Sequence, residues 1–88
     1  MQRNEKWLED MQVKLSDVCK AYNWDLKQTS ALAEVGTRSF VVKHGNKSIT
    51  VLISNLICTR IEADVILEYD DIEYDEDQVR TLLARKLL

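Results

Sequence analysis

The chain has 88 residues with no proline, two glycines and a net charge of −3. A chain of this length is expected to form one domain with a limited core, because folding buries only about 60% of its unfolded surface. No apolar run approaches the ~20 residues of a membrane span, and the first residues lack the apolar core of a signal peptide. Cys19 and Cys58 form no C-x-x-C pattern, so we expect reduced thiols and a cytoplasmic location.

The charge is distributed unevenly along the chain. Residues 1–60 contain nine Lys or Arg against six Asp or Glu, and residues 61–88 contain three against nine. The two parts therefore carry net charges of +3 and −6. An asymmetry of this kind influences whether a protein attracts partners with a positively or a negatively charged surface.

The first predicted element is an amphipathic helix over residues 4–22. Its apolar stripe recurs every three or four residues and consists of Trp7, Met11, Leu15, Val18 and Tyr22, widened by Leu8 and Cys19. Asn4 is the predicted N-cap. Asn23 is predicted to end the helix, because asparagine tolerates the left-handed backbone conformation.

Residues 24–36 fit two different structures. Alternation of apolar and polar residues favours a strand near residues 28–35 that turns around Gly36. Asp25 and Gln28 equally form a capping pair for a short helix that ends at Gly36. We favour the strand.

The clearest prediction is a β-hairpin centred on Gly45 and Asn46. Glycine and asparagine tolerate positive φ, which two-residue hairpin turns require, and β-branched and aromatic residues flank them. The predicted pairs are His44 with Lys47, Val42 with Ile49 and Phe40 with Val51. One face then carries Phe40, Val42, Ile49, Val51 and Ile53, and the other carries Ser39, Val41, Lys43, Ser48, Thr50, Leu52 and Ser54.

A further strand and a helix follow. The strand buries Ile61, Ala63, Val65, Leu67 and Tyr69 and turns outward Glu62, Asp64, Ile66, Glu68 and Asp70. The helix begins at the predicted N-cap Asp75, and Gln78 completes a capping box. Its apolar stripe is Val79, Leu82, Leu83 and Leu87.

These elements predict a single α+β domain over residues 1–88. Its expected architecture is an N-terminal helix, a three- or four-stranded antiparallel meander and a C-terminal helix. Both helices are expected to lie on one face of the sheet, because a sheet must bury its apolar face against another layer.

The residues that commonly carry catalysis or bind metals form no recognisable site. The single histidine, His44, lies beside the hairpin turn, and neither a G-x-S-x-G motif nor a glycine-rich phosphate loop is present. An EF-hand loop counted from Asp71 requires glycine at its sixth and glutamate at its twelfth position, where the chain has Glu76 and Leu82. We therefore expect no enzyme activity, no metal site and no cofactor.

The leading hypothesis is a small acidic module that binds another protein with a basic surface. The residues predicted to face the partner are Glu62, Asp64, Glu68, Asp70, Asp71, Glu73 and Asp77. A narrower version is an inhibitor or decoy that occupies a nucleic-acid-binding surface of the partner. Small phage or viral inhibitors of host defence are often similarly compact, acidic and free of motifs.

Two alternatives remain open. The first is a structural or regulatory subunit with no inhibitory role. The second is a nucleic-acid-binding domain, because helix, three strands, helix is also the order of double-stranded-RNA-binding domains. Those domains hold phosphates with basic residues at the start of the last helix, where this chain has Asp75, Glu76 and Asp77. The basic residues elsewhere are scattered and are Lys27, Arg38, Lys43, Lys47 and Arg60.

Self-association is a separate prediction. Apolar residues interrupt the polar face of the sheet and end the last helix, and a homodimer through either surface is expected to use Val41, Leu52, Ile66 and Leu87. Leu88 extends the apolar end of the helix.

Overall fold

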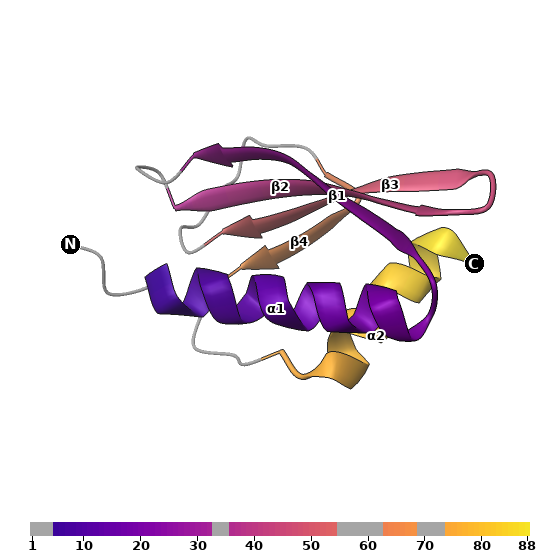
Figure 1. The fold of residues 1–88 in the computed structure, drawn as a ribbon, viewed down its shortest axis with the longest axis horizontal. Coiled ribbons are helices and arrows are strands. Elements are labelled where there is room, and N and C mark those ends of the chain that lie inside the picture. Colours follow the sequence, from indigo (N-terminus) through magenta and orange to yellow (C-terminus); the bar gives the residue numbers. More distant parts are fainter. Residues whose placement is uncertain (1–4, 33–35, 55–62, 69–73) are drawn as a thin grey trace.

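The computed structural model describes residues 5–32, 36–54, 63–68 and 74–88, and it has an α+β fold. The elements in chain order are α1 (Glu5–Ala21), β1 (Asp25–Leu32), β2 (Thr37–His44), β3 (Lys47–Ser54), β4 (Val65–Glu68) and α2 (Glu76–Leu87). The strands form one sheet in the order β1-β2-β3-β4 (Figure 1). No helix among the described residues is long and apolar enough to cross a membrane.

The last strand runs in the opposite direction to the one predicted. The pairs β1–β2 and β2–β3 are antiparallel, but β4 pairs with β3 in parallel, with Val51 opposite Val65 and Ile53 opposite Leu67. The predicted antiparallel meander is therefore wrong, and the sheet is mixed. Parallel strands need a longer connection than a hairpin turn, and ten residues separate Ser54 from Val65 in the sequence. Alternation of apolar residues places side chains on faces but does not give the direction of a strand.

The hairpin between β2 and β3 is confirmed with its register. Val42 lies opposite Ile49 and Phe40 opposite Val51. Gly45 has φ +61°, whereas Asn46 has a negative φ, since only Asn23 among the described residues other than glycine has a positive one. A positive φ at the first turn position alone is the pattern of a type II′ turn.

Helix α1 ends as the sequence predicted. Asn23 adopts the left-handed conformation with φ 59°. The Trp24 N–H donates to the Cys19 carbonyl at 2.8 Å, and the Asn23 N–H donates to the Lys20 carbonyl at 3.4 Å. These two bonds form a Schellman motif, in which the residues that close the turn also pack together. Trp24 and Cys19 are both buried in the core. The predicted N-cap, Asn4, lies outside the described residues.

Strand β1 decides between the two structures open for residues 24–36. The segment is a strand from Asp25, so the helical alternative is wrong and the strand starts earlier than predicted. A β-bulge lies between Gln28 and Ser30, and the Thr29 hydroxyl donates to the Ser39 carbonyl at 3.1 Å. The extra residue shifts the register, which simple alternation of side chains does not reveal.

One buried cluster joins both helices to the sheet. It contains Leu8, Met11, Leu15, Val18, Cys19, Trp24, Phe40, Val42, Ile49, Val51, Ile53, Val65, Leu67, Val79, Leu83 and Leu87. All five residues predicted for the inner face of the hairpin are among them. Tyr22 is the exception in the predicted stripe of α1, with 48% of its surface exposed, because it lies in the turn after the helix has ended.

We expect Gly45→Val to lower the free energy of unfolding by about 1–3 kcal/mol, because a β-branched residue is strained at positive φ. A Cβ at Gly45 would meet no atom within 4 Å, so the Cβ itself adds no steric clash to the backbone strain. Asn46→Val is the matched control and should change the free energy by less than about 0.5 kcal/mol. Urea denaturation measures both, and equal midpoints for the two variants would contradict the turn assignment.

The buried thiol of Cys19 generates a prediction about pH. Burial raises the pKa of the Cys19 thiol from its ordinary value of 9.0 to about 11. The unfolded chain therefore loses this proton at lower pH than the folded chain. The resulting stability is complete below pH 9.0 and is lost as the pH rises through about 11.

Between pH 8 and pH 10 we expect the wild-type chain to lose about 1 kcal/mol more stability than Cys19→Ala, from ~1.4 kcal/mol per pKa unit. Cys58 is common to both proteins and cancels in the comparison. Urea unfolding at each pH measures the difference. Parallel pH profiles for the two proteins would contradict a buried neutral thiol.

Candidate protein-interaction surface

A small hollow lies between the second half of α1 and the first half of α2. Its volume is about 130 Å³. Its lining residues are Asp17, Val18, Ala21, Tyr22, Glu76, Asp77 and Arg80. We call it the acidic hollow, because three carboxylates line it against one guanidinium.

The packing of the two helices explains why these carboxylates meet. Val18 of α1 and Val79 of α2 are both buried in the core, so the residues beside them are brought to a shared surface. Asp17 precedes Val18, and Asp77 lies two residues before Val79. The Lys14 ammonium of α1 donates to the Tyr74 carbonyl at 2.5 Å and ties α1 to the segment before α2.

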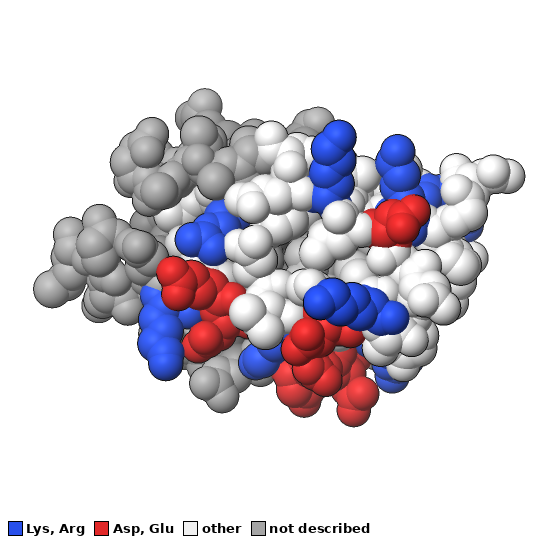
Figure 2. Space-filling model, viewed as in Figure 1, with Lys and Arg blue, Asp and Glu red and all other residues white. Residues whose placement is uncertain are grey.

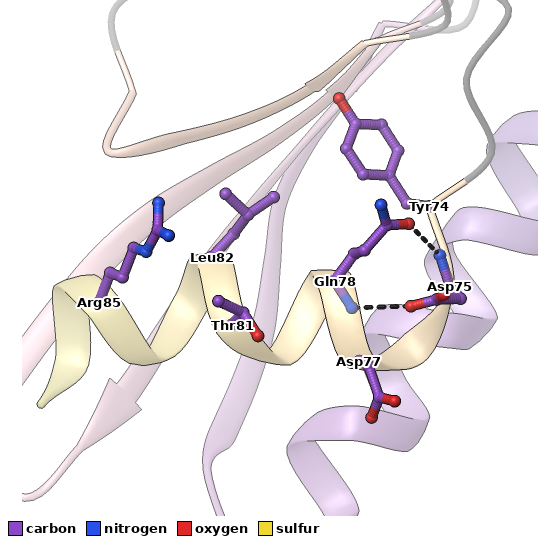
Figure 3. Close-up of a pocket in the computed structure, with 7 residues that line it drawn as sticks. All are labelled: Tyr74, Asp75, Asp77, Gln78, Thr81, Leu82 and Arg85. Carbon is purple, nitrogen blue, oxygen red and sulfur yellow. Dashed lines mark hydrogen bonds between the residues drawn. The ribbon is translucent and has the colours of Figure 1, made fainter.

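The start of α2 is set by a capping box. The Asp75 carboxylate accepts from the Gln78 N–H at 2.8 Å, and the Gln78 side chain accepts from the Asp75 N–H at 2.9 Å (Figure 3). This confirms the predicted cap and places Glu76 and Asp77 in the first turn. The positive end of the helix dipole stabilises their negative charges there.

Tyr22 forms a rigid wall of the acidic hollow. Its ring stacks on Trp24 with centroids 5.3 Å apart, and the Arg80 guanidinium carbon lies 6.0 Å from the Tyr22 centroid. Trp24 also meets the exposed His44 edge-on, at 6.3 Å. The ring is therefore held by the turn that ends α1 and by a residue of α2.

The fold uses some exposed carboxylates and leaves others unused. The carboxylates of Asp17, Glu76 and Asp77 form no hydrogen bond or ion pair with another residue that the structure describes. Asp75, in contrast, is engaged in the capping box. The hollow therefore has two more negative than positive charges and is suited to bind a cationic group.

The predicted partner-facing residues are distributed over separate parts of the structure. The exposed Asp64 joins β4 to β3, because its carboxylate accepts from the Thr50 N–H at 2.8 Å and its own N–H donates to the Thr50 carbonyl at 3.0 Å. Glu68 is half-buried at the end of β4, and Asp77 lines the acidic hollow. The remaining predicted residues lie outside the described residues and are Glu62, Asp70, Asp71 and Glu73.

Sequence reasoning missed four charged or aromatic residues of the acidic hollow, which are Asp17, Tyr22, Glu76 and Arg80. Asp17 falls on the polar side of the α1 pattern, and Glu76 is one of several acidic residues at the start of α2. Only the packing of α1 against α2 brings them together, so no spacing within either helix indicated a shared site.

The residues predicted for self-association differ in exposure. Val41 and Ile66 are half-buried, whereas Leu52 and Leu87 are each only 2% exposed. Leu87 belongs to the core cluster, and Leu88 is 74% exposed. The apolar surface at the end of α2 therefore comes from Leu88.

Acidic side chains concentrate on one part of the surface, whereas basic side chains are spread more widely. Figure 2 shows most Asp and Glu along the lower part of the view, where Figure 1 places α1 and the start of α2. Lys and Arg stand among them and also over the strands in the upper part. Within the described parts of the chain, no three His, Cys, Asp or Glu side chains are grouped to hold a metal ion.

Comparisons with protein-family models, with curated proteins and with solved structures find no match.

Mutation can separate the two roles of Asp75, its hydrogen bond as the N-cap of α2 and its negative charge. We expect Asp75→Ala to lower the free energy of unfolding by about 1 kcal/mol, because it removes the cap, whereas Asp75→Asn retains an acceptor and should cost little. Thermal and urea unfolding measure both variants. If Asp75→Asn is as unstable as Asp75→Ala, the charge rather than the cap is responsible.

Proposed function

We propose that the chain is a small protein-binding module whose acidic hollow receives a lysine or arginine side chain from a basic partner. The observation that carries the proposal is the meeting of three carboxylates from two helices at one hollow beside an exposed aromatic ring. The fold does not use these carboxylates for hydrogen bonds among the described residues, so they are available to a partner.

The energetics favour a role in recognition and association rate. An exposed ion pair contributes about 0–1 kcal/mol, so three carboxylates do not make a tight complex alone. Complementary charge nevertheless increases the rate of encounter and selects against acidic partners. The rigid Tyr22 wall limits where an incoming cation can lie. Apolar contacts around the hollow would provide the remaining affinity.

A narrower form of the proposal concerns the partner. Residues 61–88 carry a net charge of −6. This charge is complementary to the basic surface of a partner that binds the phosphates of nucleic acid. The chain would then act as an inhibitor or decoy, because its carboxylates occupy the positions at which the partner holds nucleic acid.

The proposal also includes the placement of the helices. We place both α1 and α2 on the sheet face that carries Phe40 and Val51, and the single core cluster that contains side chains of all these elements supports it. The acidic hollow then lies on the helical side of the molecule, away from Lys27 and Lys43 on the strands.

The observed order of elements gives little support to the nucleic-acid alternative. The sheet has four strands with a parallel pair, whereas the analogy with double-stranded-RNA-binding domains rested on helix, three strands, helix. The start of α2, where those domains hold phosphates, carries the unpaired carboxylates of Glu76 and Asp77.

The test is a titration of the isotope-labelled chain with a short lysine- and arginine-rich peptide, followed by amide chemical shifts. We expect the largest shifts around Tyr22 and the first two turns of α2. A peptide of the same length with glutamate at the basic positions should cause none. Shifts that are spread evenly over the surface would contradict a defined site.

Two triple variants with the same change in net charge sharpen this test. The hollow variant combines Asp17→Asn, Glu76→Gln and Asp77→Asn and should bind the basic peptide about 5–30-fold more weakly, from ~1–2 kcal/mol in total. The strand variant combines Glu62→Gln, Asp64→Asn and Glu68→Gln, and its asparagine retains an acceptor for Thr50. It should bind within about twofold of the wild type. Equal losses in both variants would mean that only the overall charge matters.

A further inference from the structure

An open groove lies along α2 (Figure 3). Its volume is about 370 Å³, and its lining residues are Tyr74, Asp75, Asp77, Gln78, Thr81, Leu82 and Arg85. Tyr74 and Leu82 are partly buried and pack against the core, and Thr81 and Arg85 are exposed. The groove is thus an amphipathic face of α2 that the described residues leave open.

The charges along this face are arranged with opposite signs at its two ends. Asp77, Thr81 and Arg85 are spaced four residues apart and form one ridge of the helix. The acid and the base are eight residues apart, or about 12 Å along the helix axis, and Thr81 lies midway between them. The Asp75 carboxylate is already engaged in the capping box, so Asp77 is the acid available at this end.

We propose that this groove binds α2 of a second copy of the chain in antiparallel orientation, with the two-fold axis at Thr81. In this arrangement Asp77 of each copy faces Arg85 of the other. A two-fold interface requires a surface that is complementary to itself. Opposite charges at equal distances from Thr81 satisfy this requirement, whereas a parallel arrangement would bring like charges together.

Apolar and small residues fit the same arrangement. Leu88, 74% exposed, lies seven residues after Thr81, and Tyr74 lies seven residues before it. The two-fold axis at Thr81 therefore brings Leu88 of one copy towards Tyr74 of the other. Thr81 is small, and helices that cross at small residues approach to about 8–10 Å.

A wholly basic or wholly acidic partner fits this groove less well than a second copy does. Such a partner would be attracted at one end and repelled at the other, whereas the antiparallel copy satisfies both ends. One face of a twelve-residue helix is small for an interface, so we expect a weak dimer that exchanges with the monomer. The two proposals share Asp77, which lines both the acidic hollow and the groove, but Thr81 and Arg85 line only the groove, so variants at these two positions test the dimer separately.

Sedimentation equilibrium of the full chain tests the dimer. The wild type should show a monomer–dimer equilibrium with a midpoint below about 300 µM. Asp77→Arg and Arg85→Asp, each alone, bring like charges together and should weaken the dimer at least about tenfold. An equimolar mixture of these two variants restores both opposite-charge contacts. It should form a heterodimer within about threefold of the wild-type affinity.

Matched controls separate this interface from general charge effects. Glu76→Arg and Lys86→Asp make the same charge changes on exposed positions of α2 that do not line the groove, and they should leave the dimer within about twofold. Thr81→Glu places two carboxylates at the axis and should abolish the dimer, while the basic peptide still binds at the acidic hollow. Urea unfolding verifies that each variant is folded.

Three results would overturn the proposal. They are a wild-type chain that remains monomeric at about 300 µM, a variant mixture that does not associate, and a dimer that Thr81→Glu leaves intact. The last result would assign self-association to another surface, such as the sheet. Loss of the dimer with retained peptide binding supports the interface and leaves the proposed function standing.

Discussion

The register of the β2–β3 hairpin is the constraint on which the rest of the structure depends. Gly45 takes a positive φ that ordinary residues avoid, and the turn pairs Phe40 with Val51. Because side chains alternate between the faces of a sheet, a slip of one residue would turn the inner side chains of the hairpin away from the core. Burial of each large inner residue contributes roughly 1.5–3 kcal/mol, so the five inner residues together contribute more than the strain that one glycine relieves.

The helices depend on the shared core and on their own ends. α1 and α2 contribute to the same buried cluster as the hairpin, so neither helix needs strong intrinsic stability. The Schellman turn after α1 directs Trp24 into the core and leaves Tyr22 at the surface. The capping box fixes the residue at which α2 begins and therefore which carboxylates occupy its first turn. The Schellman turn after α1 and the capping box before α2 thus determine which residues line the acidic hollow.

The acidic residues fall into two groups that composition alone does not separate. Asp64 and Asp75 bind backbone N–H groups and serve the fold, Asp64 at the junction with β3 and Asp75 at the helix cap. Asp17 and Glu76 have no such partner among the described residues and lie together although they are distant in the chain. Carboxylates that form no hydrogen bond or ion pair within the described residues are the ones that a partner can bind. The distinction supports a proposal centred on the hollow rather than on the strand.

The sequence by itself determined the features that depend on residues within a few positions of one another. These are the turn at Gly45, the end of α1 at Asn23 and the capping box at Asp75, each specified by local backbone conformation and local hydrogen bonds. The tertiary structure alone decided the direction of β4, because an alternating pattern reads the same in parallel and antiparallel pairing. It also decided the bulge at Thr29, which depends on the partner strand. The acidic hollow belongs to the same class, since it exists only where two helices that are far apart in sequence pack together.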